Sequence, residues 1–190
     1  MRKQKIAELI SQFRNPSEAE RYYSYRLEDH QKMFIPKLAQ GILANTQPRP
    51  CECLILNSFL AFCLGQKGIL VATVIGDLII EGRQVFNKCT EMPYSNSNGL
   101  IEREWDGHCW IEIDDYIGDI SLFRTADITT DKSLKDFLIK KFGFNQNVLF
   151  KPYTDLTFNN VEFIPKFVLN ETQITNFCTT LDYFENNQVQ

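Results

Sequence analysis

The segment 51–64 constrains the fold most, because nearly all of its residues are apolar. Its length favours a helix, and a helix that is apolar on most sides has to be buried. Prolines at positions 48 and 50 force extended backbone just before the segment. Glycines at positions 65 and 68 end it. We therefore expect one helix in the interior, with the other elements arranged around it.

Helical patterns precede this segment and strand patterns follow it. Apolar spacing, with a capping-box pattern from Ser17 to Glu20, predicts helices over 3–13, 17–27 and 31–43, the last broken or kinked at Pro36. The Val- and Ile-rich run 69–80 predicts a long strand in which Gly76 allows a bulge. Further strands are expected over 83–87, 108–113, 116–121, 148–150 and 161–167, a loop over 90–106 and a helix over 132–141, while 172–184 fits either type. This order predicts an α+β fold with an antiparallel sheet.

Length and charge exclude several classes of protein. A chain of 190 residues suits one compact domain, and we expect 1–46 to be a helical addition to a core over 47–190. A net charge of −4 offers no electrostatic footprint for nucleic acid. No apolar stretch is long enough to span a membrane, and the N-terminus lacks a signal-peptide core. The six cysteines form no disulfide framework, so the sequence predicts a cytoplasmic protein with mostly free thiols.

Cys53 is the first candidate for chemistry. It lies in the first turn of the predicted buried helix, where unpaired backbone N–H groups and the helix dipole favour an anion. A thiol in such a position has a lowered pKa and is available as a nucleophile. Cys51 lies two residues nearer the helix start and remains an alternative. A buried cysteine that acts only as a small apolar side chain is the alternative without chemistry.

The predicted hairpin supplies a partner for this thiol. If Asp114 and Asp115 form a two-residue turn, the numbers of facing residues sum to 229, and His108 and Asp119 become diagonal neighbours about 7–8 Å apart. The face that they share is more polar than the other and is expected to lie outside the core. It comprises His108, Trp110, Glu112, Ile117, Asp119 and Ser121. A carboxylate that orients a histidine, which in turn activates a thiol, is a catalytic triad.

The same residues carry a resemblance to a known family. Two segments are similar to the transglutaminase-like superfamily. The first resembles the cysteine helix of that superfamily and comprises Cys53-Leu54-Ile55-Leu56-Asn57 with Leu60, Leu64, Gly68-Ile69, Ala72, Val74 and Gly76. The second resembles its His-x-Trp-x-Glu strand and comprises Gly107-His108-Cys109-Trp110-Ile111-Glu112-Ile113. Asp119 follows where the family's aspartate is expected, at a spacing closest to compact bacterial members. The pattern departs at Cys51, where the family has Gly, at Thr73, where it often has Arg, and after Asp119.

The resemblance implies a papain-like core in which Cys53 is the nucleophile, His108 the general base and acid, and Asp119 the orienting carboxylate. Arylamine N-acetyltransferases share the helix and the Asn four residues after the Cys, which is Asn57 here. Asn57 and Trp110 are candidates for the substrate groove. Gln47, together with the Cys53 backbone N–H, is a candidate donor to the oxyanion.

The sequence thus predicts a Cys-His-Asp enzyme that acts on a peptide, a protein or a small acyl substrate through a thioester. A peptidase or amidase is the first hypothesis; an acyltransferase or a non-catalytic interaction module is the alternative. No cofactor is expected. Side chains of the types that bind zinc are present: Cys51, Cys53, Cys89, His108 and Cys109. The sequence lacks the Cys-x-x-Cys spacing of a zinc knuckle, so no metal is expected. Residues 122–190 carry no recognisable motif.

Overall fold

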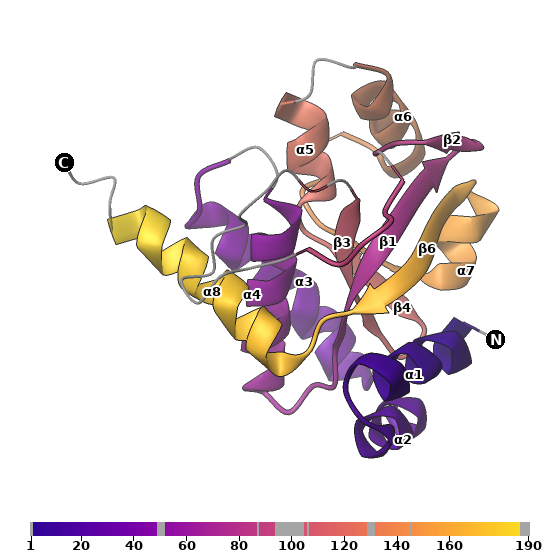
Figure 1. Ribbon diagram of the computed structural model, residues 1–190. Helices are drawn as coiled ribbons and strands as arrows, with labels where there is room; N and C mark the ends of the chain where they lie inside the picture. Colours follow the sequence, from indigo (N-terminus) through magenta and orange to yellow (C-terminus); the bar gives the residue numbers. More distant parts are fainter. Residues whose placement is uncertain are drawn as a thin grey trace.

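The computed structural model describes residues 2–48, 52–86, 88–93, 105, 107–128, 132–144 and 146–186, the last seven of these as backbone only. Helices surround a curled antiparallel sheet, which confirms the predicted α+β class (Figure 1). Most of the predicted loop 90–106 lies outside the described residues.

The N-terminal region is helical, as predicted, but two details differ. It consists of α1 (Arg2–Phe13), α2 (Pro16–Ser24) and α3 (Asp29–Ala44). The cap of α2 is Asn15, whose side chain accepts the Glu18 backbone N–H at 2.9 Å, so the N-cap lies two residues before the predicted Ser17. Pro36 lies inside α3, which continues through it.

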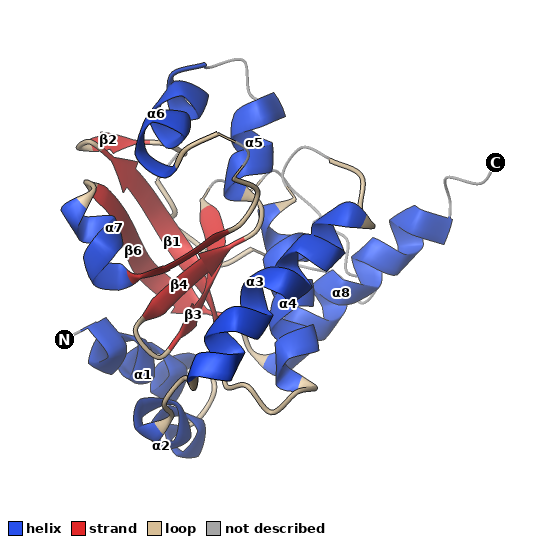
Figure 2. Cartoon of the chain, turned by 180° about the vertical axis from the view of Figure 1, so that it is seen from behind, coloured by secondary structure: helices blue, strands red, loops and turns tan. Residues whose placement is uncertain are grey.

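The apolar segment forms α4 (Cys53–Gly65), and most of its residues are buried. It packs on the sheet on one side and against α3 and α8 (Glu171–Asn186) on the others (Figure 2). The region 172–184, which fitted either element type, is therefore helical. The prediction of an interior helix is confirmed.

The sheet is built around its longest strand. Its strands are β1 (Ala72–Ile80), β2 (Arg83–Gln84), β3 (His108–Ile113), β4 (Tyr116–Asp119), β5 (Leu149–Pro152) and β6 (Val161–Val168). β1 pairs with β3 along its first half, with β2 at its end and with β6 along most of its length, and β3, β4 and β5 follow in order. The register between β1 and β6 shifts between Ile75 and Gly76, as expected near Gly76, but the extra residue is Lys166 of β6 and not a residue of β1.

Both faces of the sheet are covered. Ile6 and Ile10 of α1 belong to one apolar cluster with Trp110 of β3. On the other side, α3 and α4 pack against Ile111 and Ile113. α5 (Leu122–Ile128), α6 (Lys132–Phe142) and α7 (Tyr153–Phe158) complete the chain. Of these three, only α6 was predicted, and no helix in the described part of the chain is long and apolar enough to cross a membrane.

Gly76 gives a test of this architecture. A Cβ atom there would lie 1.9 Å from the Ile164 carbonyl oxygen, and that oxygen belongs to backbone that cannot rotate away. We expect Gly76→Ala to lower the free energy of unfolding by about 2 kcal/mol or more in urea titrations. The control is Gly41→Ala in α3, where a Cβ meets nothing within 4 Å. Better helix propensity should make that variant more stable by about 1 kcal/mol. Equal stability of the two variants would contradict the described bulge.

Candidate active site

The structure brings the three predicted catalytic residues to one place. Cys53 is the first residue of α4, His108 the first of β3 and Asp119 the last of β4. The hairpin has the predicted register, since Ile113 faces Tyr116 and Ile111 faces Gly118. Asp114 has a positive φ of 55°, as a tight two-residue turn requires.

A buried hydrogen bond joins His108 to Asp119. Nε2 of His108 donates to Oδ2 of Asp119 at 2.5 Å, and both side chains are fully buried. The other carboxylate oxygen, Oδ1, accepts the backbone N–H and the hydroxyl of Ser121 at 2.9 and 2.8 Å and the Leu122 N–H at 3.1 Å. Burial alone would raise the pKa of Asp119, but the charge of His108 and these hydrogen bonds lower it. Asp119 is therefore held as an anion.

Aromatic rings enclose the His108 imidazole. Phe86 stacks on it with ring centroids 4.7 Å apart and planes 12° from parallel, and Trp110 stacks at 6.2 Å. Burial alone would lower the pKa of His108, but the Asp119 carboxylate, its hydrogen bond and the Cys53 thiol raise it to about 10. The imidazole is thus a cation at neutral pH, and aromatic faces attract such a charge.

The second ring nitrogen of His108 is the one open to the thiol. Nδ1 has no hydrogen-bond partner among the described residues, whereas Nε2 is occupied by Asp119. Cys53 lies near enough to contribute to the raised pKa of the ring. Cys53 is only partly buried, at the margin of an apolar cluster. The alternative nucleophile, Cys51, lies outside the described residues.

The sequence-based prediction that Asn57 lines the substrate groove is wrong, because its side chain is fully buried. Its amide nitrogen donates to the Cys109 carbonyl at 2.9 Å and to Asp119 Oδ1 at 3.3 Å, and also to the Cys53 carbonyl one turn earlier. Its oxygen accepts the Ile120 N–H at 3.2 Å. Asn57 therefore fixes the start of α4 against both strands of the hairpin and acts as a positioning residue.

Trp110 is not a groove residue either, and the polar hairpin face does not lie outside the core. Trp110 and Glu112 are buried, and Nε1 of Trp110 donates to Oε1 of Glu112 at 2.9 Å. The sequence-based expectation was wrong because β3 is an inner strand and α1 covers this face. Arg2 of α1 pairs with Glu112 and neutralises its charge. A carboxylate on an inner strand requires a cation, but sequence alone did not indicate Arg2.

Arg124 is a second residue that sequence reasoning missed. It extends from α5 to the connection before α4, donating to the backbone carbonyls of Leu43 and Thr46 and pairing with Glu52 at 3.4 Å. Glu52 directly precedes Cys53, so Arg124 holds the chain that leads into the nucleophile. Gln47, in the same connection, is exposed, and its role as an oxyanion donor stays a prediction.

Burial shifts the pKa of three other thiols. It raises the pKa of Cys63, raises that of Cys89 to about 11 and raises that of Cys109 well above its ordinary value. Cys53, Cys63, Cys89 and Cys109 form no disulfides, in agreement with the expected free thiols. Within the described ranges, no three His, Cys, Asp or Glu side chains are arranged to hold a metal ion.

The His108–Asp119 pair predicts a pH dependence of stability. His108 has a higher pKa in the folded chain than its ordinary value of 6.5, so the folded state binds more protons above that pH and loses stability as pH rises. Between pH 6.5 and about 8.5, before ordinary thiols titrate, the free energy of unfolding should fall by up to about 1.4 kcal/mol per pH unit.

Asp119→Asn is the matched variant for this measurement. It leaves a buried imidazole without a counter-ion, so we expect a loss of about 3 kcal/mol at pH 6.5 and no fall over the same pH range. Denaturant titrations at several pH values measure both quantities. Parallel pH profiles for the two proteins would show that His108 carries no charge in the folded state.

The site can therefore do two things chemically. It can hold a proton on an imidazole that a buried carboxylate orients, and it can present a partly exposed thiol beside that imidazole. Comparisons with known proteins were made by sequence and by structure. No protein-family model matches the sequence, and no curated protein or solved structure is significantly similar to the chain.

Proposed function

We propose that this chain is a thiol enzyme of the transglutaminase-like type that cleaves an amide or acyl bond through a thioester acyl-enzyme, as a peptidase or amidase. The observation that carries the proposal is the fully buried hydrogen bond of 2.5 Å between His108 and Asp119, with Cys53 beside the same imidazole. If the ion pair of His108 and Asp119 served stability alone, it would not need a partly exposed thiol beside the second ring nitrogen of His108.

In the acylation step, the Cys53 sulfur reacts as a thiolate, and the proton of the thiol is the one that Nδ1 of the charged His108 imidazole holds. The sulfur then attacks the substrate carbonyl carbon, and the carbonyl oxygen becomes an oxyanion. The Cys53 backbone N–H is a donor for that oxyanion, because the first N–H groups of a helix lack partners within the helix. The protonated imidazole gives its proton to the leaving nitrogen, the C–N bond breaks, and a thioester remains on Cys53.

In the deacylation step, His108 takes a proton from water, and the resulting hydroxide attacks the thioester carbonyl. The C–S bond breaks, the acid leaves, and the proton returns to the sulfur. Throughout both steps Asp119 holds Nε2, so that the ring cannot turn away and its charged form is stabilised. No cofactor takes part. If an amine replaces the water, the same thioester yields acyl transfer.

The fold supports the proposal in its coarse features. The helix that carries the cysteine packs on an antiparallel sheet, as a papain-like core requires, and the order along the chain is Cys, His, Asp. The N-terminal helices are additions to that core in this proposal, although α1 also supplies Arg2 to the buried Glu112.

An activated ester tests the proposal directly. With p-nitrophenyl acetate we expect a burst of p-nitrophenolate and an acetyl group that peptide mapping locates on Cys53. Cys53→Ala should abolish the burst. Cys63→Ala, on the same helix and also partly buried, should leave it unchanged. Asp119→Asn should slow acylation by about a hundredfold or more.

A milder variant keeps the test decisive if Asp119→Asn does not fold. Ser121→Ala removes one hydroxyl donor from Asp119 and should slow acylation by about tenfold with the fold intact. If the cysteines are acetylated in proportion to their exposure, and at the same rate in the Asp119 and Ser121 variants, the result would instead favour the non-catalytic module. Transfer of the acetyl group to added glycinamide, in place of acetate release, would favour the acyltransferase.

A further inference from the structure

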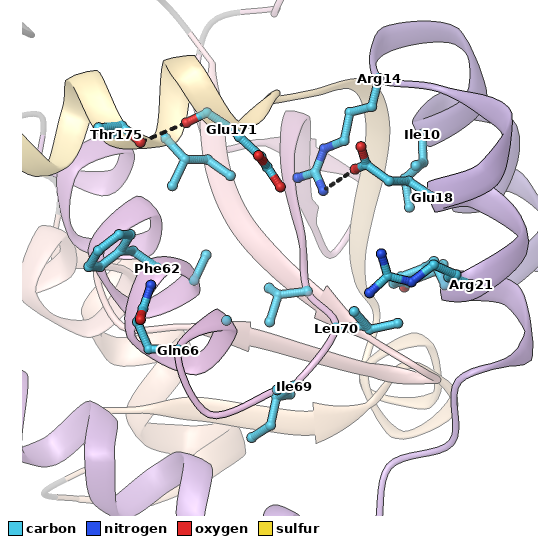
Figure 3. Close-up of a pocket in the computed structure, with 16 residues that line it drawn as sticks. Ile10, Arg14, Glu18, Arg21, Phe62, Gln66, Ile69, Leu70, Glu171 and Thr175 are labelled. Atoms are coloured by element: carbon cyan, nitrogen blue, oxygen red, sulfur yellow. Dashed lines mark hydrogen bonds and ion pairs between the residues drawn. The ribbon is translucent and has the colours of Figure 1, made fainter.

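A cavity of about 480 Å³ lies at the opposite end of α4 from Cys53. Its walls come from the corner between α1 and α2, the last turns of α4 with the following chain, and the first turns of α8 (Figure 3). Phe62 and Gln66 face it from one side and Arg14 and Arg21 from the other. A volume of this size is typical of sites for small molecules.

The cavity is separate from the candidate active site. Cys53 begins α4, whereas the cavity touches that helix from Ala61 onward. At 1.5 Å per residue, Cys53 and Ala61 are roughly 12 Å apart along the helix axis. A molecule that binds in the cavity therefore does not occupy the position of the proposed substrate.

Arg14 is the buried charge of this cavity. Its side chain is 10% exposed; Nε donates to the Leu169 carbonyl at 2.7 Å, and Nη1 pairs with Glu18 at 3.4 Å. Nη2 has no hydrogen-bond partner in the described part of the chain. A buried guanidinium N–H without an acceptor is costly, and burial lowers the pKa of Arg14. An oxygen acceptor on a bound molecule would satisfy this group.

Two further charges of opposite sign face each other across the cavity. Arg21 extends into it from α2, and Glu171 points into it from the first turn of α8 toward Arg14 (Figure 3). Neither side chain forms an ion pair within the described ranges, although Glu171 is near enough to act on the charge of Arg14. Glu18, by contrast, is already engaged by Arg14 and Asn15. The available groups are thus cationic on the α2 side and anionic on the α8 side.

Apolar side chains line part of the cavity between these charges. Ile10, Ile69, Leu70 and Ile174 line it, and Phe62 of α4, 42% exposed, lies at its edge. A simple anion would meet Glu171, and a simple cation would meet Arg21. A molecule that carries both charges, with an apolar group between or beside them, meets both charged sides and the apolar part of the cavity.

We propose that this cavity binds a zwitterion with an apolar side chain, namely a free α-amino acid or a short peptide. Its carboxylate lies against Arg21 and Nη2 of Arg14, its ammonium group against Glu171, and its side chain against Ile69, Ile174 and Phe62. The inference does not depend on the proposed function, because none of these residues belongs to the candidate active site.

Titration of the full chain with four probes tests the proposal by NMR chemical shifts. L-leucine and the dipeptide Leu-Leu carry both charges; N-acetyl-leucine lacks the ammonium group, and leucinamide lacks the carboxylate. We expect saturable binding of leucine or of Leu-Leu, and binding at least about tenfold weaker for each singly charged probe. Comparison of leucine with Leu-Leu separates the free amino acid from the short peptide.

Charge-removing variants assign the two ends. Arg21→Gln should weaken leucine binding, with a smaller preference for leucine over leucinamide remaining because Nη2 of Arg14 still meets the carboxylate. Glu171→Gln should reduce leucine affinity to that of N-acetyl-leucine. The controls are Lys5→Gln and Glu20→Gln, exposed residues outside the cavity, and Cys53→Ala, all of which should bind leucine like the unaltered chain. The proposal is overturned if neither leucine nor Leu-Leu binds saturably, or if the singly charged probes bind equally well.

Discussion

The buried pair of His108 and Asp119 is the constraint on which the rest of the site depends. Two ionised side chains in the interior are tolerated only when each is paired and hydrogen-bonded. Ser121, Leu122 and Asn57 supply the donors that Asp119 needs, and Phe86 and Trp110 enclose the imidazole. Each of these contacts removes an alternative rotamer or a competing water, so the geometry of the pair is set by the packing around it.

The interior helix connects this pair to the nucleophile. Because α4 is apolar on most sides, it can be buried between the sheet, α3 and α8, and its start is fixed from two directions. Asn57 holds it against the hairpin from within, and Arg124 holds the preceding chain from outside. A thiol on an exposed helix would lack this support and would not remain beside Nδ1 of the imidazole.

The sequence predicted those parts of the fold that local pattern decides. The interior helix, the two-residue turn and the diagonal placement of His108 and Asp119 follow from spacing alone. The prediction for Trp110 failed because burial of the polar hairpin face depends on α1, whose Arg2 is 110 positions away from Glu112. The prediction for Asn57 failed because its side chain turns inward to the Cys109 carbonyl and to Asp119. α5 and α7 were missed because helices of seven and six residues carry too few periodic positions to be detected.

The contacts of Arg2 also set the order in which the chain can assemble. Its guanidinium pairs with Glu112 and donates to the Phe163 carbonyl, 161 residues further along the chain. During synthesis α1 is made before β6, yet it cannot complete these contacts until β6 has left the ribosome. Until then the central strand holds a carboxylate without its cation, and the sheet is exposed where α1 will cover it. The face of the sheet under α1 is therefore sealed only after β6 has been made, 161 residues beyond Arg2.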